Sequence, residues 1–167
     1  MKNKHLTRHI RLKPDISETH RLEGFIEQIC DDFHIYDAYY GNILASNTMA
    51  LEMLLELEGG QKGHADVYFN KTAKGIYFSI VLGGHFLDFA RLYEKIRHMD
   101  PNDPEAYDGE GKTMMMIRML SDEITMNSEK EAMVLTFYVT GINDMLSLQR
   151  IQLLEKYYER VHKLTEA

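Results

Sequence analysis

The stretch that decides the fold is residues 109–139, GEGKTMMMIRMLSDEITMNSEKEAMVLTFYV. Its first part is rich in methionine and predicts a helix over 112–121. The rest holds two runs that alternate apolar with polar residues, 123–127 and 132–140, and such runs are typical of neighbouring strands. A segment with two prolines and two glycines, 100–111, precedes the helix, and we expect a loop without regular structure there.

Elements of the same two kinds lie on both sides of this stretch. Strands are predicted where apolar and polar residues alternate, and helices where apolar residues recur every three or four positions. Upstream, these rules predict a strand at 6–13, helices at 15–33 and 37–57, a hairpin at 64–82 that turns at 72–75, and a helix at 86–99. Downstream, they predict an amphipathic helix from about residue 143. This order of elements indicates an α+β layer sandwich.

The composition is that of one ordinary globular domain. The chain has 167 residues, of which 44% are hydrophobic and 27% charged, and its formal net charge is −7. This acidic balance, without a long run of lysine or arginine, argues against a nucleic-acid partner. No run approaches the roughly 20 apolar residues that span a bilayer, and residues 1–13 lack the apolar core of a signal peptide. We therefore expect no membrane partner and a cytoplasmic location.

Two residue types raise the question of a catalytic or metal site. The single cysteine, Cys30, lies in an apolar stripe and is predicted to be a core thiol. His5 and His9 are four residues apart on a predicted strand, where side chains at that spacing stand ~13 Å apart and cannot chelate one metal ion. No other His, Cys, Asp or Glu cluster has ligand spacing, so no metal site is predicted.

Residues 106–113 fit a relaxed phosphate-loop pattern, in which glycines let backbone N–H groups close on phosphates. A true phosphate loop follows a buried strand. Here the preceding segment holds two prolines and several acidic residues, and it cannot be a core strand. Asp108 and Glu110 would also repel phosphate from within the loop. We therefore reject the phosphate-loop interpretation.

Residues 109–139 and their surroundings resemble a known family. The resemblance is carried by a glycine-rich lid and an LIR-L-DE helix, matched here by Gly111, Met116, Ile117, Arg118, Leu120, Asp122 and Glu123. This part is similar to the C-terminal half of the histidine-kinase-like (GHKL) ATPase domain, in its anti-sigma-factor serine kinase branch. The resemblance covers about residues 7–140. It implies a domain at 1–141 built as a two-layer α/β sandwich, with a mixed, mostly antiparallel sheet covered by helices, and a C-terminal helix extension at 142–167.

The resemblance implies where a nucleotide site would lie, and the chain departs from the family there. The family's asparagine-box helix carries a glutamate base and, one turn later, an asparagine that coordinates magnesium. Aligning ILASNTMALEM, residues 43–53, puts Asn47 at the glutamate and Leu51 at the asparagine. Sliding the alignment by one turn makes Asn47 the magnesium ligand but leaves Ile43 at the base position. Catalysis is expected to be lost either way, because neither an amide nor an isoleucine can act as the base.

The family's glycine box and lid are also altered. In VLGGHF, residues 81–86, Val81 replaces the aspartate that binds adenine. The lid residues either keep some phosphate-binding character or form only a flexible loop and a helix start. The resemblance thus implies a degenerate nucleotide site without a catalytic residue, made of Asn47, Gly83, Gly109, Gly111, Lys112 and Thr113. No cofactor is expected, and ATP and magnesium would bind only if the site is retained.

The resemblance also implies a class of partner. That branch binds a sigma factor or a small anti-anti-sigma protein, and phosphorylates the latter. We predict a regulatory protein–protein interaction module with lost or weak ATP binding, and the alternative is an active serine/threonine kinase with a rebuilt site. The C-terminal helix carries an apolar stripe at Leu148, Ile151, Leu154, Tyr158 and Val161. The stripe is typical of a helix that docks on its own sheet and equally of one that forms a homodimer.

Overall fold

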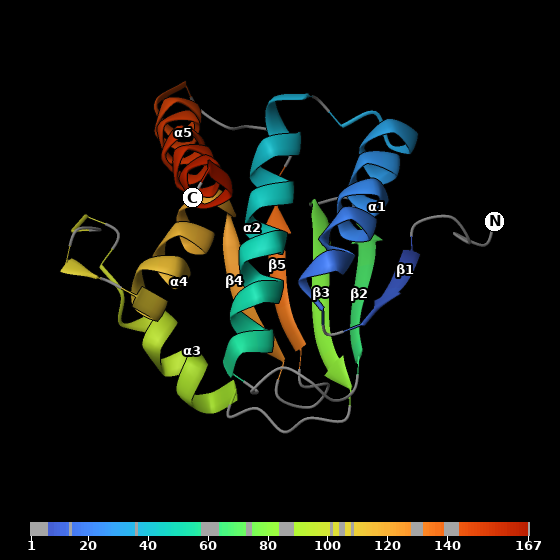
Figure 1. The fold of residues 1–167 in the computed structure, drawn as a ribbon, viewed down its shortest axis with the longest axis horizontal. Helices are drawn as coiled ribbons and strands as arrows, with labels where there is room; N and C mark the ends of the chain where they lie inside the picture. The colour runs from blue at the N-terminus through green and yellow to red at the C-terminus, as the bar shows by residue number, and fades with distance from the viewer. Residues whose placement is uncertain are drawn as a thin grey trace.

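The computed structural model describes residues 7–13, 15–35, 37–57, 64–72, 75–83, 89–100, 102–103, 106–107, 109–127, 132–138 and 144–166. The elements are β1 (Thr7–Leu12), the 3-10 helix η1 (Ile16–Glu18), α1 (Thr19–Asp32), α2 (Asp37–Leu57), β2 (His64–Lys71), β3 (Ile76–Gly83), α3 (Phe89–Arg97), α4 (Gly109–Leu120), β4 (Glu123–Asn127), β5 (Ala132–Phe137) and α5 (Asp144–Glu166). Figure 1 shows α1 and α2 lying across the front of the sheet, with α3, α4 and α5 grouped toward its β4 edge. The predicted α+β two-layer architecture is confirmed. None of the described helices is long and apolar enough to cross a membrane.

The sheet has five strands in the order β1-β2-β3-β5-β4, and all neighbouring strands are antiparallel. The expectation of a mixed sheet is therefore wrong for the described strands. β2 with β3 and β4 with β5 are consecutive in sequence and pair antiparallel, as hairpins do. Two helices, α1 and α2, separate β1 from β2 and return the chain to the end of the sheet where β1 finished. β2 therefore also runs antiparallel to β1.

One face of the sheet packs against the helices and forms the core. Phe69 of β2, Phe78 of β3 and Phe137 of β5 are buried there, with ring centroids 5.4 Å and 6.1 Å apart along the row. Strand alternation puts every second residue on this face. Cys30 of α1 is buried as well, and burial raises the pKa of its thiol to about 11. The prediction of a core thiol is confirmed.

Helix α4 begins earlier than predicted, at Gly109 rather than Lys112, so Gly109 and Gly111 lie in the helix and not in a loop. Gly109 has a φ of 57°, a left-handed conformation that glycine adopts without the steric cost of a side chain. The methionine run that follows, 114–116, is buried in the core. Gly109 thus lets the chain begin α4 with a positive φ, and the buried methionines anchor the helix in the core.

Candidate functional site

Helix α2, which holds the positions aligned with the family's base and metal ligand, is the central helix of the fold. It contacts β3 and β5 of the sheet and also α1, α4 and α5. The three positions compared with the family's base and metal ligand, Ile43, Asn47 and Leu51, lie on successive turns of α2, and all three are buried. This face of α2 is therefore packed core.

The Asn47 side chain is fully buried, and its amide is only partly satisfied. Its Nδ2 donates a hydrogen bond to the backbone oxygen of Ile43 at 2.8 Å, whereas its Oδ1 has no hydrogen-bond partner among the described residues. The Oδ1 of Asn42 is buried without a partner in the same part of the chain. Between them, the Ser46 hydroxyl donates to the Asn42 backbone oxygen at 2.6 Å. These two amide oxygens are buried acceptors that a ligand or an ordered water would satisfy.

The glycine-box residues lie at the end of β3. Gly83 is the last residue of that strand and pairs with His64 of β2. Strand alternation puts Ile80 and Leu82 in the core and Val81 on the opposite face, level with Asp66 of β2. The sheet therefore separates the Val81 side chain from Asn47. An aspartate at position 81 would face Asp66 and not a pocket beneath α2.

The lid residues, 109–113, form the start of α4. Lys112 is exposed, and the Thr113 hydroxyl donates to the Gly109 backbone oxygen at 3.4 Å. Helix α4 packs against α2, yet no hydrogen bond in the described part of the chain joins this turn to Asn47 or to Gly83. The predicted site residues thus occupy three elements, and only those of α4 are adjacent to one another.

A charged cluster that the sequence analysis missed lies on the sheet face away from the helices. The buried Asp66 carboxylate of β2 accepts a hydrogen bond from Arg11 Nε at 2.9 Å and lies 2.7 Å from His9 Nε2. His64 Nε2 is 3.1 Å from the second carboxylate oxygen, and His9 stacks on the Tyr68 ring at 4.5 Å. The sequence did contain a pattern that predicts this cluster. His9 and Arg11 are two residues apart on one strand, and His64, Asp66 and Tyr68 have the same spacing on the strand that pairs with it. Where the chain is described, no group of three or more His, Cys, Asp or Glu residues is arranged to hold a metal ion.

The Asp66 carboxylate predicts a pH-dependent stability. Burial alone would raise its pKa, but the hydrogen bonds from Arg11 and His9, together with the nearby charges of Arg11 and His64, hold the pKa below its usual value. Because the folded pKa lies below the unfolded one, the stabilisation is present above about pH 4 and is lost as the pH falls through the folded pKa. We expect Asp66→Asn to lower the free energy of unfolding by about 1 kcal/mol at pH 7 and by less near pH 2.5, where more of the carboxylate is protonated.

Urea denaturation at the two pH values measures this difference. Asp31→Asn is the control, because Asp31 is an exposed carboxylate on α1, and the substitution should change the free energy of unfolding little at either pH. A loss of equal size at both pH values in Asp66→Asn would contradict the role given to the ionised carboxylate.

Helix α5 docks on its own chain through one side. Its buried Arg150 donates to the Asp122 carboxylate at 2.7 Å and to the Met119 backbone oxygen at 3.2 Å, which ties α5 to the end of α4. Tyr157 is buried too, and burial, with Glu52 nearby, raises the pKa of its phenol to about 12. The helix therefore docks on α2 and α4 of its own chain, but the buried residues lie beside the apolar stripe, and Ile151, Tyr158 and Val161 of the stripe are exposed. Docking of the stripe on the sheet is thus not observed for these three residues. Pairing with a second chain stays a prediction.

Comparison with known proteins finds no family model that matches the chain and no curated protein of significant sequence similarity. The resemblance to the histidine-kinase-like ATPases therefore stays a prediction, based on residues 109–139 and the order of elements around them. What the structure adds is the placement of each predicted residue: Asn47 in the core, Gly83 at a strand end, and the lid residues at a helix start.

Proposed function

We propose that this protein is a regulatory protein–protein interaction module of the anti-sigma type, related to the histidine-kinase-like ATPases, in which ATP binding is lost or weak. Its partner is a sigma factor or an anti-anti-sigma-like protein, as the resemblance implies. The observation that carries the proposal is the burial of Ile43, Asn47 and Leu51 on one face of α2. In the family this face presents the base and the metal ligand, whereas here two of the three side chains are apolar.

The order of elements supports the relation to that family, whereas the all-antiparallel sheet of the described strands departs from the mixed sheet that the relation implies. Helices α1 and α2 cover the sheet, and α4 leads into the hairpin β4–β5 in the order that the family follows. The lid position corresponds to residues 109–113, where α4 starts. Helix α5 lies beyond the part of the chain that resembles the family, and we treat it as an extension that stabilises and enlarges the domain.

The residues at the predicted site do not fit a magnesium–ATP complex. Magnesium takes an octahedral set of oxygen ligands, including at least one from the protein. The Asn47 amide offers the only side-chain oxygen among positions 43, 47 and 51 of α2. Val81, at the place of the adenine-binding aspartate, has no polar atom in its side chain and lies on the far face of the sheet. No catalytic step therefore follows from these residues.

We expect the purified protein to bind magnesium-ATP with a Kd above about 100 µM. Losing a hydrogen bond to a charged group and a metal ligand removes about 4 kcal/mol of binding free energy, which turns a micromolar site into a millimolar one. Isothermal titration calorimetry with magnesium-ATP makes the measurement. A low-micromolar Kd would contradict the proposal.

An active serine/threonine kinase is the second candidate, and one observation favours it. The buried Oδ1 of Asn47 lacks a partner in the described residues. An unsatisfied buried acceptor costs about 1–3 kcal/mol, and a bound ligand would relieve that cost. If Asn47 binds magnesium, Asn47→Ala abolishes a micromolar affinity for magnesium-ATP. If the proposal holds, wild type and variant bind equally weakly in the same titration.

A further inference from the structure

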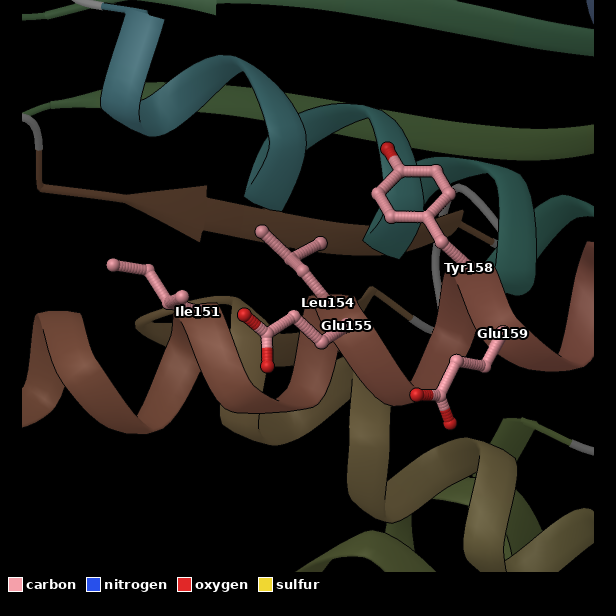
Figure 2. A pocket seen from close by; sticks show the side chains of 5 residues that line it. All are labelled: Ile151, Leu154, Glu155, Tyr158 and Glu159. Atoms are coloured by element: carbon pink, nitrogen blue, oxygen red, sulfur yellow. The ribbon is translucent and has the colours of Figure 1, made fainter.

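An apolar strip is partly exposed along the side of α5 that lies next to α2 (Figure 2). Ile151, Tyr158 and Val161 are 50%, 47% and 38% exposed, and they are three of the four exposed large hydrophobic residues in the described part of the chain. Figure 2 shows Ile151, Leu154 and Tyr158 projecting from the same side of the helix. Because isolated apolar residues on a surface are ordinary but a gathered set marks an interaction site, this strip requires an explanation.

Two hollows meet along the strip. The first has a volume of about 510 Å³ and is lined by apolar and acidic residues of α5, namely Ile151, Leu154, Glu155, Tyr158 and Glu159. The second, of about 480 Å³, lies between α1, α2 and α5, and its lining includes Tyr40, Tyr158 and Val161. The first hollow is a shallow depression on α5 alone, whereas the second has helical walls. Tyr158 lines both, so the two hollows adjoin at this residue, and we call them together the α5 groove.

Carboxylates border the α5 groove. Glu155 and Glu159 stand on α5 beside the apolar strip (Figure 2), and Glu23 of α1 borders the second hollow. Arg160 is a cation at that hollow, so the border of the groove carries both signs with an excess of negative charge. A partner that covers the strip must bring positive charge to these carboxylates, because electrostatic complementarity sets the specificity of an interface.

Because helices line the α5 groove, we expect the partner segment to be a helix and not a strand. The backbone groups of α1, α2 and α5 are bonded within each helix, so the walls offer no strand edge for pairing. Grooves between helices bind amphipathic helices through apolar residues at i, i+3, i+4 and i+7. The strip from Ile151 to Val161 spans about 15 Å along α5, which matches about three turns of a partner helix.

We infer that the α5 groove binds a basic amphipathic helix of another protein. The apolar face of that helix packs on Ile151, Leu154 and Tyr158, and its Lys or Arg side chains pair with Glu155 and Glu159. A second copy of this chain fits less well, because a two-fold contact through the groove brings two sets of carboxylates together. The inference rests on the proposed function, since it names the surface through which the module binds its partner.

A synthetic peptide of roughly 14 residues tests the inference, with leucine at i, i+3, i+4 and i+7 and lysine at the flanking positions. We expect calorimetry with the full chain to give a micromolar Kd, and the same peptide with glutamate in place of lysine not to bind. Tyr158→Ala should weaken binding about tenfold or more, and so should Glu155→Lys combined with Glu159→Lys. The matched control is Glu94→Lys with Asp103→Lys, which changes net charge equally at exposed positions outside the groove and should keep the affinity.

Three results would overturn the inference. They are equal binding of the two peptides, no binding of the basic peptide, and unchanged affinity in the groove variants. Light scattering at about 50 µM adds a fourth: a dimeric full chain that Tyr158→Ala converts to a monomer would place a second copy in the groove. The magnesium-ATP titration does not depend on the groove, so the proposed function and this inference fail separately.

Discussion

Replacing Arg150 by methionine is expected to lower the free energy of unfolding by about 3–5 kcal/mol. The Arg150 and Asp122 side chains are 3% and 13% exposed, and their nitrogen and oxygen lie 2.7 Å apart. Methionine keeps much of the apolar volume but leaves the Asp122 carboxylate without its cation and the Met119 backbone oxygen without a donor. Asp122 still accepts a hydrogen bond from the Tyr138 backbone N–H, which keeps part of the cluster together. Urea denaturation followed by circular dichroism measures the loss.

The Arg8–Asp32 pair is the matched control for this variant. Its nitrogen–oxygen distance is also 2.7 Å, but its side chains are 38% and 34% exposed. Exposed ion pairs contribute about 0–1 kcal/mol, and Arg8 adds a contact over the Phe33 ring at 5.5 Å. Arg8→Met should therefore cost about 1 kcal/mol. Equal losses in the two variants would show that burial is not what makes the Arg150 pair strong.

The sequence predicted regular elements well where one periodicity dominates. Helix α2 has the predicted bounds, 37–57, because its apolar residues recur at helical spacing and glycines follow it. The start of α4 was missed, because the pattern of prolines and glycines indicates a loop and does not reveal that Gly109 adopts a positive φ. The antiparallel directions of β1 with β2 and of β3 with β5 depend on how the helices between them return the chain, which local patterns do not record.

The candidate site was less predictable, since it depends on which way side chains face. An alignment places Val81 near the nucleotide, whereas strand pairing places it across the sheet from α2. The apolar stripe of α5 was predicted from its helical spacing. Residues next to the stripe in the sequence are apolar too, so periodicity alone does not show that Tyr157 is buried and Tyr158 is exposed. The Arg150–Asp122 pair joins residues far apart in the sequence, and no local pattern reveals such a pair.

Gly75→Ala is the second substitution with a large expected effect, a loss of about 3 kcal/mol in the free energy of unfolding. Gly75 precedes β3, and a Cβ atom added there would stand 2.6 Å from the Phe137 backbone oxygen and 3.1 Å from the Tyr138 ring. A flexible side chain could move aside, but a backbone oxygen in a paired strand cannot. Phe137 of β5 pairs with Ile76, the residue after Gly75, so relieving the contact requires shifting β5 against β3.

Gly24→Ala is the matched control, and we expect it to raise the free energy of unfolding where Gly75→Ala lowers it. Gly24 lies within α1, it is exposed, and a Cβ atom added there has no neighbour within 4 Å. Alanine is the better helix former, so this variant should gain about 0.5–1 kcal/mol. Thermal unfolding of the two variants beside the wild type should therefore move the Tm down for Gly75→Ala and up for Gly24→Ala. A Gly75→Ala variant that unfolds at the wild-type Tm would mean that β3 and β5 are not as close at this end of the sheet as the structure places them.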